Sequence, residues 1–281
     1  MGLRINTNTA SLNAQRNLMS TKLGLDRSLE RLSSGFRINR AGDDAAGLAI
    51  SENLRAQIRG LRQASRNAQD GVSLVQVAEG SLNEISSILI RLRELAVQAA
   101  SDTIGPVERQ FLNVEFDQLL SEIDRIADST EFNGTQLLSG TGSILDFQVG
   151  TRNDPNIDRL SFDASKADAN TAALGMNLTS VADKASAQNT LAAIDSAIVS
   201  VSAMRADFGA IQNRLQSTIS NLAVSVENMS AANSRIRDVD VAEETAELTK
   251  NNILLQAGTS VLAQANQTAQ TALTLLNRTF S

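Results

Sequence analysis

One stretch decides the fold: "LRAQIRGLRQASRNAQDGVSLVQVAEGSLNEISSILIRL", residues 54–92, in which apolar residues recur every seven positions. The seven-residue series consists of Leu54, Leu61, Ala68, Val75, Leu82 and Leu89, accompanied by Ile58, Val72, Ile85 and Leu92. A heptad repeat of this length indicates a coiled-coil seam rather than an ordinary surface helix. Gly60, Gly71 and Gly80 interrupt the stretch, and each either costs up to about 1 kcal/mol against Ala or permits close backbone approach.

A second helical pattern precedes this stretch. Ile5, Leu12 and Met19 are seven residues apart, and so are Leu18, Leu25 and Leu32. This narrow apolar stripe predicts an amphipathic helix that stops at residues 33–35, "SSG". Gly42, Asp43 and Asp44 then mark the start of the long helix, because acidic side chains favour the positive end of a helix dipole.

After the long helix, a turn at residues 103–106 places Pro106 at the first position of a third helix, roughly 107–129. The pattern puts Phe111, Val114, Leu119, Ile123 and Ile126 on one side of this helix. "FNG" at residues 132–134 is a strong turn signal. Alternation in "SILDFQV" (143–149) and "DRLSFDA" (158–164) predicts a small hairpin or short sheet.

Helical periodicity returns from about residue 187 and breaks near residues 233–240. The last helix contains "LLQAGTSVLAQANQTAQTALTLL", residues 254–276, which carries no charge and yet has an apolar stripe. That stripe comprises Leu254, Leu255, Val261, Leu262, Leu273 and Leu276. An uncharged face suits close helix-to-helix contact, where a buried Lys or Glu would be costly.

These elements predict a mainly α fold, a long antiparallel coiled-coil-like helical bundle with a small β-hairpin region. The terminal helices are expected to pair N- with C-terminus. The expected segments are a terminal helix and linker at 1–42, and the long and third helices with the hairpin region (about 130–180) at 43–180. A returning helix at 181–236 and a C-terminal helix at 237–281 complete them.

The amino-acid composition excludes several classes of catalytic and binding site. The 281 residues include no Cys, His, Trp or Tyr, which excludes thiolate and imidazole catalysis, disulfides and the common zinc motifs. No phosphate-binding glycine motif occurs, so we expect no enzyme and no cofactor or metal. No run of eighteen apolar residues is present, which argues against membrane insertion, and the N-terminus lacks an ordinary secretory signal. Residues 1–66 carry a net charge of +6, but without interleaved aromatics, so we expect no nucleic-acid binding.

Burial energetics raise the question of what the terminal stripes pack against. Ordering a residue costs about 1–2 kcal/mol in backbone entropy, and a two-helix pair buries little surface at about 25 cal/mol per Å². We therefore predict termini that fold only when many copies pack together. The pattern alone supports equally well a monomeric four-helix bundle completed by the two ends.

Five segments in order resemble the terminal signatures of bacterial flagellins: "INTNTASLNAQRNL", "LERLSSGFRINRAGDDAAGLAIS", "IRLRELAVQAASD", "EIDRIADSTEFNG" and "ILLQAGTSVLAQANQ". The resemblance covers essentially the whole chain. It implies an extracellular helical filament for swimming motility, with the terminal helices as an inner tube and the long helices as an outer tube. It also implies export through the flagellar type III apparatus. With only about fifty residues between the third helix and the returning one, this chain is similar to short flagellins without large outer domains.

The same resemblance implies partners. These are further copies of the chain, an export chaperone at the C-terminal helix, and cap and hook-associated proteins. It also implies that the vertebrate flagellin-sensing Toll-like receptor recognises the monomer through Arg91, Leu95 and Glu115. In that interpretation Arg91 supplies a guanidinium fork, Leu95 an apolar knob and Glu115 a carboxylate. The alternative interpretation makes Arg91 and Glu94 an ordinary surface pair and Leu95 a subunit contact.

Two other functions fit parts of the pattern. A hook–filament junction protein shares the terminal helices but is expected to differ at the C-terminal signature. A cytoplasmic helical signalling module could show similar heptads, but it would lack the uncharged C-terminal helix.

Overall fold

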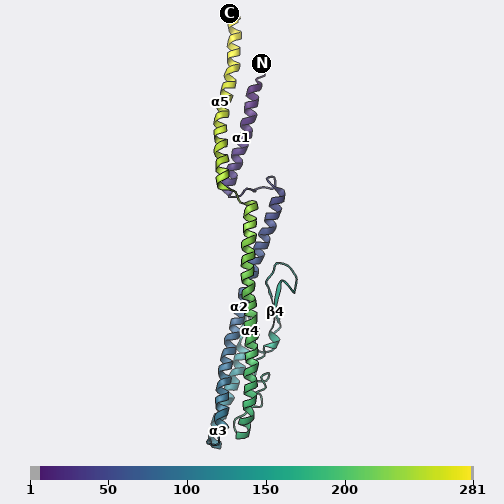
Figure 1. Ribbon diagram of the computed structural model, residues 1–281, viewed down its shortest axis with the longest axis vertical. Helices are drawn as coiled ribbons and strands as arrows, with labels where there is room; N and C mark the ends of the chain where they lie inside the picture. Colours follow the sequence, from purple (N-terminus) through teal and green to yellow (C-terminus); the bar gives the residue numbers. More distant parts are fainter. Residues whose placement is uncertain (1–6, 280–281) are drawn as a thin grey trace. The chain divides into compact units, whose positions relative to one another are not determined.

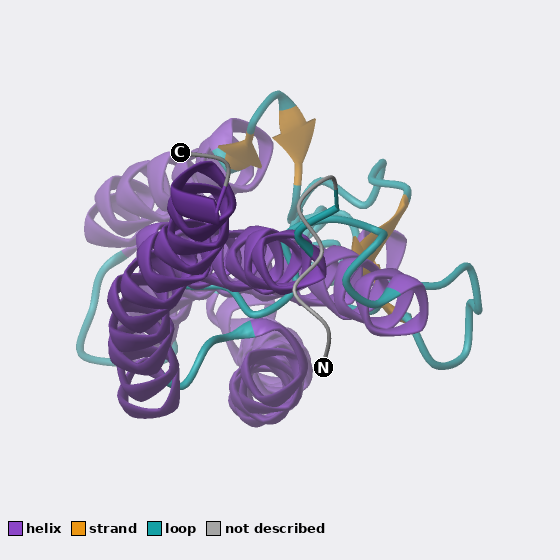
Figure 2. Cartoon of the chain, turned by 90° about the horizontal axis from the view of Figure 1, so that it is seen from above, coloured by secondary structure: helices purple, strands orange, loops and turns teal. Residues whose placement is uncertain are grey.

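The computed structural model describes residues 7–279, with the side chains of residue 269 and residues 272–279 left out. Within that range the chain is mainly α-helical, as predicted (Figure 2). The helices are α1 (Thr9–Ser34), α2 (Ala45–Ala99), α3 (Pro106–Ser129), α4 (Lys184–Arg237) and α5 (Val241–Thr279). The described residues form two compact units, one of residues 57–228 and one that joins the residues up to 56 with those from 229 onward.

The heptad series of α2 forms the centre of the 57–228 unit. Ala68, Val75, Leu82 and Leu89 are completely buried, as the spacing predicts, and the helix runs unbroken through all three glycines. The partner side chains come mainly from α3 and α4: Phe116, Ile123, Ile194, Val201, Phe208 and Leu215. A single core therefore joins three helices along their length (Figure 1).

Helix α3 begins at Pro106 as predicted, but the prediction that its apolar residues lie on one side is wrong. Phe116 and Ile123 are fully buried, whereas Phe111 and Val114 are 71% and 61% exposed. At roughly 100° per residue, Phe116 and Ile123 lie within about 20° of each other around the helix, but Phe111 is about 120° from Ile123. The apolar residues of α3 therefore occupy two faces, and only one of them meets the core.

Two small antiparallel hairpins follow α3. Strands β1 (Glu131–Phe132) and β2 (Thr135–Gln136) are joined by Asn133 and Gly134, whose φ angles of 50° and 77° are those of a type I′ turn. Strands β3 (Ile144–Gln148) and β4 (Arg159–Asp163) pair Leu145 with Phe162 and Phe147 with Leu160. The predicted hairpin region is confirmed as two separate two-stranded sheets.

The segment between β4 and α4 contains the short helix η1 (Ala164–Lys166) and is fastened to α3 by side chains. Asp124 accepts hydrogen bonds from the backbone N–H of Thr171 at 2.7 Å and from its hydroxyl at 2.9 Å. Asn113 accepts from the Ser180 hydroxyl and the Val181 N–H, both at 2.9 Å. These polar contacts fix an irregular segment against α3, and the segment also buries Leu174, Met176 and Val181 in the core.

In the other unit, α1 and α5 lie side by side and antiparallel (Figure 1). Near one end, the Asn8 amide donates to the carbonyl of Ala265 at 2.8 Å, and near the other Arg31 lies 3.4 Å from Glu244. Helix α1 ends where the sequence predicts, with Gly35 in the left-handed region at φ 74°. The expected pairing of the terminal helices is confirmed.

The segment that follows α1 and the segment that precedes α5 are joined by backbone hydrogen bonds. Arg37 N–H donates to the carbonyl of Arg237 at 2.7 Å, and Val239 N–H donates to the carbonyl of Gly35 at 3.0 Å. We call this pairing of residues 35–37 with residues 237–239 the junction.

Charged and aromatic side chains reinforce the junction. The guanidinium of Arg237 lies 4.7 Å from the centre of the Phe36 ring and donates to the Glu52 carboxylate at 2.6 Å. That hydrogen bond, with the nearby Arg55, holds the pKa of Glu52 below its ordinary value. The junction therefore depends in part on an ionised carboxylate.

The glycines of α2 give a paired test. A Cβ at Gly71 would lie 3.0 Å from Phe147 and 3.2 Å from Leu215, whereas a Cβ at Gly80 would meet nothing within 4 Å. We expect Gly71→Ala to destabilise the 57–228 unit by about 1–2 kcal/mol through overpacking. Gly80→Ala should stabilise it by up to about 1 kcal/mol through helix propensity. Urea unfolding measures both, and equal stabilisation by the two substitutions would contradict the close approach at Gly71.

Acid should loosen the junction. Because the folded pKa of Glu52 lies below its unfolded value, its stabilising effect is complete above the ordinary glutamate pKa and is lost as the pH falls through the folded value. Hydrogen exchange of the Val239 amide should therefore show protection that declines from neutral to acidic pH. Glu52→Gln should weaken protection at neutral pH and flatten the pH response, and an unchanged response would show that Glu52 does not control the junction.

Candidate assembly and recognition surfaces

The residues that α1 and α5 bury most fully against each other are small or polar, and half-buried leucines such as Leu18, which packs on Gly258, flank them. Ala14, Ser28, Asn251 and Ala265 are all buried between the helices. Gly24 packs against the Asn251 side chain, because a Cβ there would lie 3.3 Å from its amide nitrogen. Small side chains let the two backbones approach closely, but they bury little apolar surface. The pair is thus defined by register-specific contacts rather than by a hydrophobic core.

None of the large apolar side chains described in this pair is completely buried. Apart from Val241 in the first turn of α5, seven of them are between 46% and 69% exposed: Leu12, Met19, Leu23, Leu29, Ile253, Leu254 and Val261. We call this set the outer stripe. A monomeric protein rarely leaves so many large apolar side chains of one helix pair in water, so the outer stripe marks an interaction surface.

The structure divides the predicted self-assembly residues between two faces. Leu12, Met19, Leu254 and Val261 belong to the outer stripe. Four others, namely Leu25, Leu32, Leu255 and Leu262, are half-buried. Ile5 and the side chains of Leu273 and Leu276 lie outside the described residues.

The prediction did not include Leu23, Leu29 or Ile253 among the assembly residues, although all three are in the outer stripe. The spacing carried the signal for Leu23, which follows Met19 by four residues and so lies on the same side of the helix. Seven-residue intervals alone miss such neighbours.

A second surface lies where α3 runs beside α2. Arg91 donates to one oxygen of Glu115 from Nε at 3.0 Å and from Nη2 at 2.8 Å, and Nη1 donates to Glu94 at 3.0 Å. The hydrogen bonds from Arg91 to Glu115 and then Glu94 raise the pKa of Arg91 above its ordinary value. All three side chains are about half exposed, so this cluster presents charge to solvent.

Leu95 does not belong to that exposed surface. Its side chain is 0% exposed, packed in the core of the 57–228 unit. It follows Arg91 by four residues, but it belongs to the apolar face of α2 together with Leu92 and Ala99, both also fully buried. The predicted role of Leu95 as an accessible apolar knob is therefore wrong for this conformation of the chain.

In the part of the chain that the structure describes, no group of three or more acidic side chains gathers in a way that could hold a metal ion. None of the helices, over the part of the chain that the structure describes, is long and apolar enough to cross a bilayer. What the surface does offer is exposed apolar stripes and ion pairs.

Family models match both halves of the chain. A model of the bacterial flagellin N-terminal helical region matches residues 5–143, and one of the C-terminal helical region matches residues 191–276. A flagellin of Halalkalibacterium halodurans is 50% identical, covering 97% of this chain and 99% of its own length. A flagellin of Bacillus subtilis is 47% identical over 98% and 100% of the two chains, and a flagellar filament 33 kDa core protein of Treponema phagedenis is 45% identical over 97% and 99%.

Solved structures agree with this assignment. The crystal structure of Bacillus cereus flagellin is 35% identical and covers 60% of this chain and 94% of its own, with a TM-score of 0.50. A putative flagellar hook-associated protein of Vibrio parahaemolyticus has a TM-score of 0.58 over 70% of this chain and all of its own. Its identity of 14% shows a shared fold alone. The chain belongs to the bacterial flagellin family, and it is a structural subunit of the flagellar filament, an extracellular appendage.

Proposed function

We propose that the α1–α5 pair is the polymerising element of this subunit and that it completes its fold only against other copies. The outer stripe carries this proposal. Its side chains are about half exposed, so each would gain about half of the roughly 1.5–3 kcal/mol that full burial of an exposed apolar side chain supplies. Isolated helices are marginal in water, so a pair joined by small and polar contacts has little stability of its own.

The lack of charge near the end of the chain supports the same conclusion. The first ten residues of α5 contain the charged residues Glu243, Glu244, Glu247 and Lys250. The next charged residue is Arg278, so residues 251–277 carry no charge. Helices packed closely in a repeating assembly cannot bury unpaired charge at an acceptable cost. Uncharged Gln, Asn and Thr can instead exchange hydrogen bonds between neighbouring copies.

Before assembly, the exposed apolar residues of α5 would promote aggregation. We therefore infer that an export chaperone covers Ile253, Leu254 and Val261 in the cytoplasm, as the resemblance to flagellins implies. Cap and hook-associated proteins would meet the same terminal helices at the two ends of the filament. Export of an unfolded chain through a type III apparatus is compatible with a sequence that has no Cys to form disulfides.

Hydrogen exchange on dilute monomer and on filaments tests the polymerising role of the pair. We expect amides of α1 and α5 to exchange rapidly in the monomer and to be protected in the filament. Amides in the buried seam of α2, residues 68–89, should be protected in both states, and they serve as the internal reference. Protected α1 and α5 amides in dilute monomer would overturn the proposal.

A second candidate function is recognition of the monomer by the flagellin-sensing Toll-like receptor. The exposed cluster of Arg91, Glu94 and Glu115 favours it, because planar guanidinium groups and carboxylates on a rigid helical surface make specific contacts. We propose Arg91 and Glu115 as the receptor contacts and assign Leu95 only the support of that surface from within the core.

A matched pair of double substitutions tests the receptor contact. Arg91→Ala with Glu115→Ala should weaken receptor binding by roughly 30-fold or more, the loss typical of an interface hot spot at about 2 kcal/mol. Arg93→Ala with Asp195→Ala removes an equally exposed ion pair of 2.7 Å and should leave binding unchanged. Both should change the unfolding free energy by less than about 1 kcal/mol. Equal receptor affinity in the two variants would refute the assignment.

A further inference from the structure

Helix α3 carries an apolar strip that its own chain leaves uncovered. Val107, Phe111 and Val114 are 61%, 71% and 61% exposed. Their spacing of four and then three residues places them on one face, the arrangement by which a helix docks into a groove. Phe111 and Val114 were predicted on the same side of α3 as Ile123 but lie away from the core, and departures from a sequence pattern concentrate at functional surfaces.

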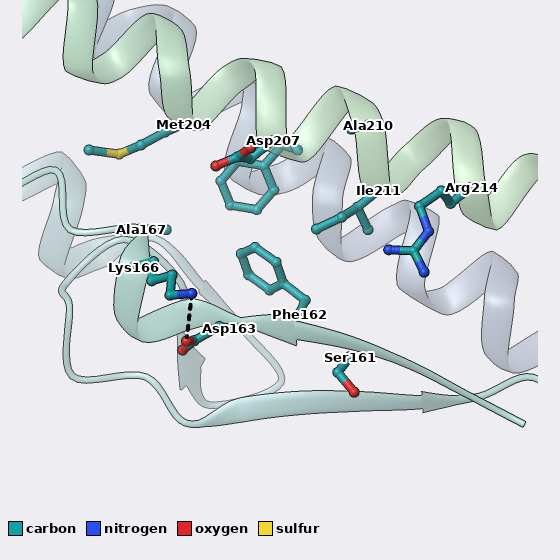
Figure 3. Close-up of a pocket in the computed structure, with 11 residues that line it drawn as sticks. Ser161, Phe162, Asp163, Lys166, Ala167, Met204, Asp207, Ala210, Ile211 and Arg214 are labelled. Atoms are coloured by element: carbon teal, nitrogen blue, oxygen red, sulfur yellow. Dashed lines mark ion pairs between the residues drawn. The ribbon is translucent and has the colours of Figure 1, made fainter. Parts of the chain in front are cut away.

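A groove of suitable chemistry lies elsewhere in the same unit, between the end of β4 with η1 on one side and α4 on the other (Figure 3). Its floor is the Phe162–Phe208 pair, whose ring centres are 4.8 Å apart. Met204, Ala167 and Ile211 complete the apolar lining, and the cavity volume is about 270 Å³. A third aromatic ring entering here would add edge or offset contacts to an existing aromatic pair.

Charges around the strip and the groove are complementary. Glu108 precedes Phe111 by three residues and so lies on the same side of α3. At the groove, Lys166 is 3.7 Å from Asp163, and Arg214 extends at the rim near Ile211 (Figure 3). Neither Glu108 nor Arg214 has an ion-pair partner within 4.0 Å among the described residues.

One copy cannot fill its own groove with its own strip. Arg91 bonds Glu115 of α3, and Arg93 bonds Asp195, so the exposed part of α3 lies level with Asp195 of α4. Phe208 follows Asp195 by 13 positions in the same helix, which is about 20 Å along the axis at 1.5 Å per residue. The two surfaces are therefore separate and available to different neighbours.

We propose that Phe111 of one copy, flanked by Val107 and Val114, docks into the Phe162–Phe208 groove of the neighbouring copy, with Glu108 meeting Arg214. A contact between two different patches of the same chain is heterologous, and its repetition generates an open helical polymer. The inference rests on filament formation by this family and names one contact within the filament. It does not depend on whether α1 and α5 fold before or after assembly.

The absence of cysteine from the sequence makes a direct test possible. A chain with Phe111→Cys and Ile211→Cys, grown from wild-type seeds and oxidised, should give a ladder of covalent dimers, trimers and higher species without reductant. Dilute monomer of the same variant should give none, because its two cysteines are too far apart. The control is Phe111→Cys with Val199→Cys, an exposed position of α4 outside the groove, which should give no ladder.

Filaments of the Phe111→Cys, Ile211→Cys chain that form normally and show no ladder would overturn the docking contact while leaving the terminal-pair proposal intact. If this chain does not grow, the two single variants are mixed on wild-type seeds, where crosslinked dimers support the contact and their absence refutes it. Should neither single variant add to seeds, hydrogen exchange of wild-type filaments decides. Protection of amides 107–114 relative to monomer supports the contact, and unchanged exchange there refutes it.

Charge reversal gives an independent readout. Glu108→Arg and Arg214→Glu should each slow seeded growth by about tenfold, and the double reversal should restore most of the rate. Failure of the double variant to recover any growth beyond the single variants would contradict the pairing of these two residues.

Discussion

The constraint on which the rest of the structure depends is that the residues most fully buried between α1 and α5 are too small or too polar to form a core, while the leucines of the pair are only half-buried. Ala14, Ser28, Asn251 and Ala265 fix how the two helices lie against each other, but they remove little apolar surface from water. The bulky residues are left on the outside. An arrangement of this kind fixes the geometry of a pair of helices. Most of the free energy of burying their apolar side chains can then be gained only by contact with other molecules.

The 57–228 unit, by contrast, buries large apolar side chains within its own core. Its heptad series is buried completely against α3 and α4, and polar links such as Asp124 with Thr171 fix the irregular segment that covers them. Such a unit can be stable as a monomer, because its core is continuous and nearly all of its buried polar groups are hydrogen-bonded, Asn170 Oδ1 being an exception. The subunit thus combines one self-sufficient part with one that gains from its neighbours, and the junction closes the second part internally through backbone hydrogen bonds.

Much of the fold could be predicted from sequence because local signals were strong and agreed with one another. Gly35 as a helix stop, Pro106 as a helix start and Asn133-Gly134 as a turn each act through backbone geometry that does not depend on distant residues. The buried seam of α2 was predictable for the same reason, since a long heptad repeat leaves only one face to bury.

The errors arose where a helix has apolar residues on two faces. In α3, Phe111 and Val114 look equivalent to Ile123 in a list of apolar positions, and only the packing of α2 and α4 determines which face is buried. Leu95 shows the reverse case, because a residue next to an exposed Arg–Glu cluster proves to be a core residue. Side-chain exposure depends on tertiary partners, and a single sequence contains no direct record of them.

The hydrogen bond between Asn8 and Ala265 joins residues 257 positions apart. This contact closes a loop that includes almost the whole chain. The α1–α5 pair therefore cannot form until nearly all of the chain has been synthesised. A copy cut short anywhere before its last helix has no partner to offer its first one. Pairing of the two ends therefore requires a copy that extends through α5, so a truncated copy cannot complete the α1–α5 pair when it meets its neighbours.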